Sequence, residues 1–414
     1  MILELGRIII VEKFGESELW VEMLQANEGD CLLITIPAAN KRILIDGGTK
    51  QTYENSLRER LLNLKQEGKK IDLLVVTHID NDHIGGIIEL LKENGSAIEA
   101  KIVEIENIWH NSYRHLQFDR INKLGEKEEL LLRKIVANGQ SNEQLHNLTG
   151  EKSISAIQGT TLAAMILAGG YSWNRHFNGL AVSSIAENID LGNGCKIRVI
   201  LPREKELVKL AKKWKRELQY SKIGFRFSDD MLFDDAYEYF WRYYSEETIG
   251  ESKEIRADIR SEKEKKSLEE LALFQGGSDN SETNQSSVSL IIEYSDKRIL
   301  LPADNVAENV MEILLKENRT FDAVKLPHHG SINNITDDFI KRIDTSKYLI
   351  STSSEKYCHP DLESIAKIVC KKTEYEKKIY FNYKIDKICD FEKEMVAIEN
   401  TEFIHLNKGQ KIVL

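Results

Sequence analysis

The feature that most constrains this chain is a short apolar run followed at once by four side chains of the kind that bind metals. Residues 73–76 form an uncharged run typical of a buried strand. Directly after it, His78, Asp80, Asp82 and His83 lie within six residues and precede Gly-Gly. Alternate residues of a loop can face one centre while the next pair faces a second. Imidazole and carboxylate together suit zinc, manganese or iron(II). The segment predicts a metal site, and a solvated charged loop is the alternative interpretation.

Other apolar runs also end in polar or charged residues. Loop mouths on a rigid sheet are where functional sites are usually built, so these positions are candidates as well. The runs alternate with helical patterns along the chain, which predicts an α/β (α+β) fold. They span residues 8–11, 31–36, 42–45, 288–294, 298–301, 322–326, 347–351, 378–381 and 403–414.

Two helical, charged blocks interrupt this order, at about 116–180 and 204–280. We expect them to be insertions into a single domain that spans residues 1–414. The stretch 275–287 is rich in Gly, Ser and Asn, which indicates a flexible connector. No internal repeat is evident in the sequence. Hydrophobic residues make up 41% of the chain, enough for a large core.

Charge and cysteine usage narrow the function classes. A net charge of -10 argues against non-specific nucleic-acid binding, unless a local basic patch such as 205–216 contributes; a solvated helix is the simpler interpretation of that segment. The five cysteines are scattered and unpaired in spacing, which fits a reducing compartment. No apolar run approaches the roughly 18 to 20 residues of a membrane span. We therefore expect a cytoplasmic protein with no membrane segment.

The loop after residue 76 resembles the metallo-β-lactamase superfamily, whose signature is His-x-His-x-Asp-His. Later and earlier segments resemble it in the same order, and the similarity is greatest to the branch that includes the hydrolase domain of ComEC-type DNA-uptake proteins. That branch often has Asp at the second ligand position, as Asp80 is here. The resemblance implies a four-layer αββα sandwich with metals at one edge of its two sheets. The further matching segments are Glu28-Gly29-Asp30-Cys31-Leu32-Leu33, Leu44-Ile45-Asp46-Gly47-Gly48, Ile299-Leu300-Leu301-Pro302-Ala303-Asp304 and Lys325-Leu326-Pro327-His328-His329-Gly330-Ser331.

The resemblance also implies how two divalent ions, Zn²⁺ or Mn²⁺, would be held. His78 and Asp80 would bind one ion, and Asp82 and His83 the other with His328 or His329. Asp304 would touch both ions, and Asp46 would orient the loop. Of the two neighbouring histidines, His328 is the preferred ligand, with His329 in contact with a ligand or the substrate.

One position departs from the superfamily pattern. The histidine of the third motif is absent, since the corresponding residues read Thr283-Asn284-Gln285-Ser286-Ser287. Either Asn284 or water completes the first site, or that site is only loosely occupied. The resulting site is rich in oxygen, so it should tolerate a harder ion such as manganese.

The function implied is hydrolysis of a phosphodiester, in nucleic acid or a nucleotide-like substrate, by metal-bound hydroxide. Asp82 would orient the nucleophile, and His359 or His329 would supply the leaving-group proton. A lactone or ester hydrolase is one alternative. Another is a non-catalytic, partner-binding module of a bacterial defence system, since similar chains accompany ATPases in such systems. His110 and the pair Trp173-Asn174 receive no chemical role, and the oligomeric state is open.

Overall fold

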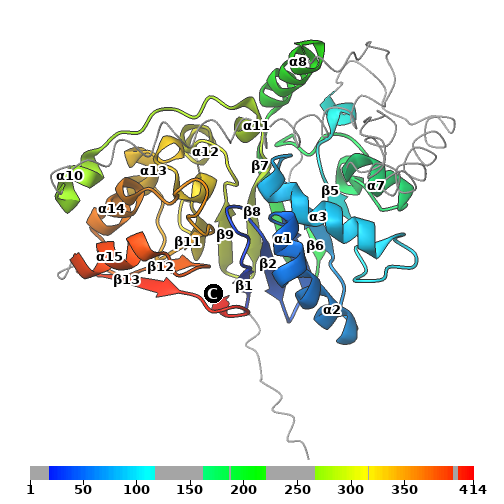
Figure 1. Cartoon of the computed structure of the whole chain (residues 1–414), viewed down its shortest axis with the longest axis horizontal. Coiled ribbons are helices and arrows are strands. Elements are labelled where there is room, and N and C mark those ends of the chain that lie inside the picture. The colour runs from blue at the N-terminus through cyan, green and yellow to red at the C-terminus, as the bar shows by residue number, and fades with distance from the viewer. Residues whose placement is uncertain (1–17, 117–161, 186–187, 221–265, 316, 395–399) are drawn as a thin grey trace, which may run out of the picture.

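The computed structural model describes residues 18–116, 162–185, 188–220, 266–315, 317–394 and 400–414. Two β-sheets lie face to face at the centre, and helices cover the outer face of each (Figure 1). This is the predicted four-layer αββα sandwich. Of the segments named from the sequence, residues 8–11 and large parts of both expected insertions, 117–161 and 221–265, lie outside the described residues.

The first sheet has six strands in the order β14-β1-β2-β3-β4-β5. Strands β1 to β3 and β14 pair antiparallel, whereas β3, β4 and β5 run parallel. The strands are β1 (Trp20–Met23), β2 (Leu32–Ile36), β3 (Lys41–Ile45), β4 (Leu73–Val75), β5 (Ile108–Trp109) and β14 (Lys411–Val413).

The second sheet has eight strands in the order β13-β12-β11-β10-β9-β8-β7-β6. Strands β9 to β13 are parallel, and β6 to β9 are antiparallel. The strands are β6 (Ile189–Gly192), β7 (Cys195–Leu201), β8 (Ser289–Tyr294), β9 (Lys297–Leu301), β10 (Ala323–Lys325), β11 (Lys347–Ile350), β12 (Lys377–Phe381) and β13 (Thr401–His405).

Helices on the two outer faces close the sandwich. Helices α1 to α3 and α7 lie over the first sheet, and α12 to α15 lie over the second (Figure 1). Their bounds, with those of α8, α10 and α11, are α1 (Lys50–Thr52), α2 (Arg58–Gln66), α3 (Asn81–Asn94), α7 (Leu162–Ala168), α8 (Glu204–Tyr220), α10 (Leu268–Leu273), α11 (Glu282–Gln285), α12 (Ala307–Leu314), α13 (Asp337–Arg342), α14 (Leu362–Cys370) and α15 (Asp386–Glu394).

The alternation of side chains along each strand builds three apolar layers. Ile43 of β3 lies in the layer between the sheets, and the next residue, Leu44, lies in the layer under the helices. In β9, Ile299 lies between the sheets and Leu300 under the second set of helices. Each of these side chains is fully buried, which contributes about 1.5–3 kcal/mol apiece. The sandwich therefore depends on continuous apolar strands.

Helix α3 follows the metal loop directly and is held by its apolar face. Ile84, Ile87, Ile88 and Leu91 recur at helical spacing and are all buried against the first sheet. The helix begins at Asn81, so Asp82 and His83 lie in its first turn. Burial of this face thus fixes the position of two predicted ligands.

In each half of the sandwich, an aspartate just before the second parallel strand accepts a hydrogen bond from the backbone of the neighbouring strand. Asp72, just before β4, accepts the backbone N–H of Arg42 at 2.9 Å and lies 3.2 Å from Lys41 Nζ. Asp322, before β10, accepts the backbone N–H of Arg298 at 2.8 Å, with a lysine ammonium at 3.3 Å. The pairing registers are equivalent. The structure therefore reveals an internal correspondence that the sequence alone did not.

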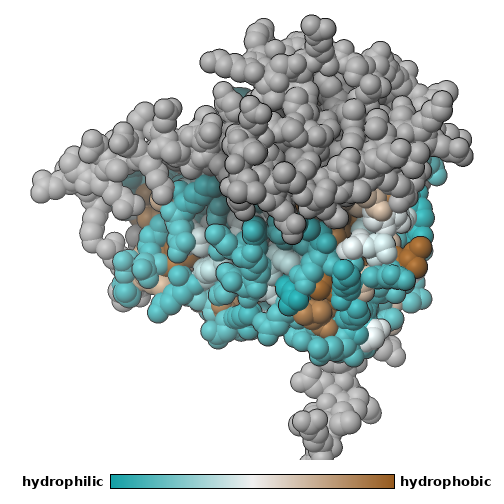
Figure 2. Space-filling view, turned by 45° about the vertical axis from the view of Figure 1, so that its right-hand side comes forward, coloured by the Kyte–Doolittle hydropathy of each residue, from teal (hydrophilic) through white to brown (hydrophobic). Residues whose placement is uncertain are grey.

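The outer surface is polar where Figure 2 shows described residues. The face seen in Figure 2 is largely hydrophilic, with small separate apolar groups. Among the described residues, no helix combines the length and apolar character needed to cross a bilayer.

Replacing Asp72 by alanine should lower the free energy of unfolding by about 1–3 kcal/mol, because a buried backbone N–H and a lysine lose their acceptor. Urea unfolding with unchanged m-values would measure this. Asp296→Ala is the matched control, since Asp296 is 71% exposed and lies 3.7 Å from Lys297 Nζ. Equal unfolding free energies for the two variants would contradict the structural role of Asp72.

Candidate metal centre

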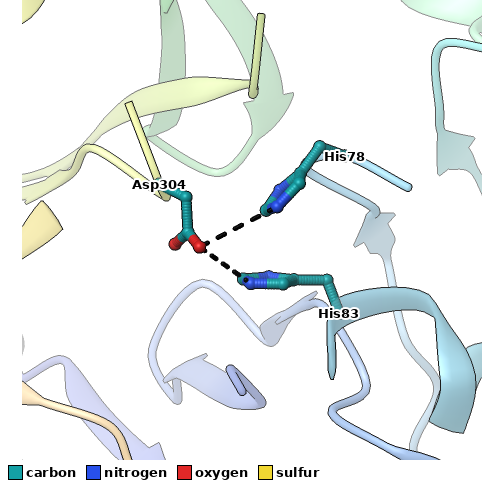
Figure 3. A group of neighbouring side chains, drawn as sticks. All are labelled: His78, His83 and Asp304. Carbon is teal, nitrogen blue, oxygen red and sulfur yellow. Dashed lines mark ion pairs between the residues drawn. The ribbon is translucent and has the colours of Figure 1, made fainter. Parts of the chain in front are cut away.

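Four loops at one edge of the sandwich supply the predicted ligands. Strands β3 and β4 are parallel neighbours, so Asp46 and His78 follow adjacent carboxyl ends. Strands β9 and β10 are parallel neighbours in the other sheet, and Asp304 and His328 follow them. Figure 3 shows His78 and the helix residue His83 pointing at Asp304 across the two halves. Residues distant in sequence thus converge, as predicted.

The buried Asp46 side chain holds the metal loop through hydrogen bonds to Thr77 and His83. Its backbone has a φ of 56°, and its side chain is completely buried. The carboxylate accepts the backbone N–H and the hydroxyl of Thr77, both at 2.7 Å, and lies 2.8 Å from His83 Nδ1. Because a carboxylate only accepts, His83 donates through Nδ1. Asp46 therefore holds the start of the loop and one imidazole in a single orientation.

Four imidazoles share one arrangement around Asp304. In each, Nδ1 lies within 3.0 Å of an oxygen, and Nε2 faces Asp304 Oδ2 at 3.3 to 3.8 Å. The Nε2 atoms of His78, His83 and His329 have no hydrogen-bond partner among the described residues. A neutral imidazole that donates through Nδ1 presents a lone pair at Nε2, the usual state of a metal ligand. The oxygens at Nδ1 are Thr77 Oγ1 for His78, Asp46 Oδ2 for His83, Asn334 Oδ1 for His328 and the Ser351 carbonyl for His329.

The two aspartates of the loop lie on different sides of this cluster. Asp80 Oδ2 is 3.6 Å from His78 Nε2. Asp82 Oδ2 is 3.9 Å from His83 Nε2 and 3.6 Å from His329 Nε2. This geometry fits divalent metal ions, because nitrogen and carboxylate donors converge on the same place and the Nε2 atoms of three of the imidazoles have no hydrogen-bond partner among the described residues.

The neighbouring histidines His328 and His329 differ in burial and in their contacts with the metal centre. His329 is buried and forms potential metal-binding groups with Asp82 and His83 and with Asp304. His328 has a side chain that is 26% exposed, and its Nε2 lies 3.7 Å from Asp304 Oδ2. The geometry favours His329 for the ion next to Asp82, whereas His328 is the ligand expected from the sequence. The ligand assignment remains a prediction.

Below Asp304 lies a buried ion pair that sequence reasoning did not assign. Lys325 Nζ is 2.5 Å from Asp30 Oδ2 and 3.9 Å from Asp304 Oδ1. Burial opposes charge on both partners, yet their attraction holds the pKa of Lys325 above its ordinary value and lowers that of Asp30 to about 2. One oxygen of Asp304 therefore faces an ammonium, and the other faces the imidazoles. Both residues stood within motifs quoted from the sequence, but their pairing required the fold.

The Gly29 backbone lies against the metal loop. A β-carbon at Gly29 would lie 1.7 Å from the Asp82 carbonyl oxygen, so only glycine fits there. The neighbouring Asp30 N–H donates to the same carbonyl at 3.3 Å. This close approach explains why the segment from 28 to 33 belongs with the metal loop.

Other residues singled out from the sequence have structural surroundings. The His110 ring stacks on Trp173 at 6.1 Å, and its carbonyl accepts Trp173 Nε1–H at 2.9 Å and Asn174 Nδ2–H at 3.0 Å. The pair at 173 and 174 therefore fixes the loop after β5. His359 lies near the centre, with its ring 5.6 Å from that of His328 and Nδ1 3.6 Å from Asp361.

Lys325→Met should destabilise the metal-free fold by about 3–5 kcal/mol, because Asp30 would be left charged and buried without its partner. The double variant Lys325→Met, Asp30→Asn should regain a large part of that loss. Chemical unfolding of the two single variants and the double variant would complete the cycle. If the losses of unfolding free energy in the two single variants simply add up in the double variant, the two residues are not coupled.

Stability of the metal-free protein should fall as the pH rises above about 6.5. Burial opposes charge on His83 and His329, but Asp304 and the neighbouring carboxylates outweigh it and raise both pKa values well above the ordinary value. A raised pKa contributes stability that is complete below the unfolded value and is lost as the pH passes the folded one. Bound metal must displace these protons, so its affinity should rise with pH.

The free energy of unfolding should be measured between about pH 6.5 and 8.5, first in the presence of EDTA and then in the presence of Mn²⁺ or Zn²⁺. Calorimetry in buffers of different ionisation enthalpy would count the protons released on metal binding. Metal-free stability that increases across this range would contradict the arrangement of imidazoles and carboxylates.

Over 91 residues the chain is 35% identical to ComE operon protein 3 of Bacillus subtilis (strain 168), a match that covers 19% of this chain and 12% of that protein. The chain therefore corresponds to only a small part of this relative's length.

Among solved structures, Zn²⁺-bound PqqB from Methylobacterium extorquens superimposes with a TM-score of 0.36 and 9% identity, covering 95% of this chain and 99% of PqqB. CmlA, a diiron beta-hydroxylase from Streptomyces venezuelae, gives 0.34 and 10%, covering 97% and 54%. Similarity at these scores supports no inference about this chain, whose fold class follows from its own strand order. Residues 25–148 match the sequence profile of the Metallo-beta-lactamase superfamily. The sequence matches thus confirm the predicted resemblance to the metallo-β-lactamase superfamily over this segment, which contains the motif from His78 to His83.

Proposed function

We propose that this chain is a metal-dependent hydrolase with two divalent ions that cleaves a phosphodiester. The observation that carries the proposal is the convergence of four imidazole Nε2 atoms on one oxygen of Asp304. The donor set combines nitrogen and carboxylate oxygen, which suits Zn²⁺ and Mn²⁺.

The chain's own residues divide the work in this proposal. His78 and Asp80 would hold one ion, and Asp82, His83 and His329 would hold the other, with Asp304 as a possible ligand of either. Divalent ions at such a site supply an activated water and polarise the ester oxygen. Asp82, in the first turn of α3, orients the attacking group, because the helix fixes its backbone.

His359 is the better of the two predicted proton donors. His329 Nε2 faces Asp82 and Asp304, so this nitrogen is committed to the centre. His359 lies beside His328, and its Nδ1 is 3.6 Å from Asp361 Oδ2. A proton for the leaving group would therefore come from His359, within reach of the edge of the centre.

The choice of a phosphodiester rests on the ComEC-like resemblance and on the oxygen-rich donor set. Hydrolysis of a lactone or ester by the same residues, and a purely partner-binding role, are outcomes of the same experiment.

Asp82→Ala should lose bound metal and lower turnover of bis-p-nitrophenyl phosphate, single-stranded DNA or RNA by about 100-fold or more, because one ion loses a ligand. His359→Gln should keep its metal and lose turnover. Elemental analysis and initial rates would measure both effects, with Asp296→Asn, which changes an exposed carboxylate, as control.

A lactone and ester panel belongs in the same assay. Turnover of lactones alone would show that the substrate is not a phosphodiester, while the protein would still be a metal-dependent hydrolase. Full metal content in Asp82→Ala would count against the ligand assignment, and metal without turnover on any substrate would favour the partner-binding role.

A further inference from the structure

We propose that Asp279 is the positioning residue for His328: through Asn334 it selects the tautomer in which His328 presents Nε2 to the metal centre. This inference rests on the proposed metal centre and adds to it a residue from outside the metal-binding motifs. The Gly, Ser and Asn residues around Asp279 predict a flexible connector.

The segment that carries Asp279 is packed against the loop that follows the two histidines, so the expectation of a flexible connector was wrong here. A β-carbon at Gly276 would lie 2.3 Å from the Ile332 carbonyl oxygen, which shows how closely the two backbones approach. Gly277 N–H donates to Asn333 Oδ1 at 2.9 Å, and Asp279 N–H donates to the Asn333 carbonyl at 3.3 Å. These contacts fix the backbone from which the carboxylate projects.

The carboxylate of Asp279 is the acceptor for three donors. Its Oδ2 accepts Asn284 Nδ2–H at 2.7 Å and Asn334 Nδ2–H at 2.9 Å, and its Oδ1 accepts the Ser281 backbone N–H at 2.8 Å. All three donors are N–H groups, so the carboxylate is the acceptor in each contact.

An acceptor at this place decides which way the Asn334 amide points. The amide nitrogen must face Asp279, and it also donates to the Asp304 carbonyl at 3.1 Å. The amide oxygen is then the atom 2.9 Å from His328 Nδ1. Since this oxygen only accepts, Nδ1 carries the proton. Asp279 Oδ2, 3.3 Å from the same Nδ1, reinforces that state.

His328 needs this support more than the other imidazoles do. Its side chain is 26% exposed, whereas those of His78, His83 and His329 are at most 3% exposed. Hydrogen bonds at Nδ1 therefore replace packing as the restraint. The result is a further nitrogen donor in a centre that lacks the histidine of the third motif.

The test is a cycle of Asp279→Ala, His328→Ala and the double variant in the full chain, titrated with Mn²⁺ and Zn²⁺. Asp279→Ala should lower the affinity for one of the two ions by about 10- to 100-fold and leave the affinity for the other unchanged. The same substitution should have no further effect in the His328→Ala background, because it acts through that imidazole. Asp296→Asn is the control, and Asp279→Asn, which keeps the volume, serves if the alanine variant does not fold.

Imidazole ¹⁵N signals of the metal-free chain at alkaline pH give an independent readout. The His328 signals should report protonated Nδ1 in the wild type and a mixture of tautomers in Asp279→Ala. Equal metal affinities in wild type and variant, or an equal loss in the His328→Ala background, would overturn the inference. A wild type that binds neither ion would sink the proposed function instead, and the ¹⁵N signals alone would then decide the role of Asp279.

Discussion

The buried carboxylate of Asp304 is the interaction on which the rest of this molecule depends. One of its oxygens faces four imidazoles, and the other faces the Lys325 ammonium. A charge that is removed from water in this way is tolerated only when its surroundings compensate for it. The hydrogen bonds at each Nδ1, the Asp30 pair and the glycine contacts of the metal loop all serve to hold that compensation in place.

The centre lies between two halves that are built alike. Each half places a parallel pair of strands at the same edge and fixes it with an aspartate, Asp72 in one half and Asp322 in the other. One half contributes His78 and His83, and the other contributes Asp304. Because neither half holds a complete set of donors, packing of the two sheets against each other is a precondition for metal binding and not only for stability.

Much of this was predictable from residues. The apolar runs indicated the strands, and the spacing from His78 to His83 indicated ligands, because strand periodicity and ligand chemistry are local properties. Asp279 was beyond such reasoning. Gly, Ser and Asn around it are typical of a connector, and only the contacts with Asn333 and Asn334 show that this segment is fixed. The internal correspondence was missed for the same reason, since it consists of hydrogen bonds and not of a repeated sequence.

The sequence by itself thus determined the fold class, the position of the metal loop and the chemical character of the donors. Tertiary structure decided which donors share a centre. It pairs Lys325 with Asp30, so that neither charge faces solvent, and it buries His329 more deeply than His328. It also connects Asp279 to His328 through Asn334. The physical reason is one of range. Periodicity and residue chemistry act over a few neighbouring residues, whereas burial and charge pairing depend on which distant segments pack together, and that is fixed only when the two sheets meet.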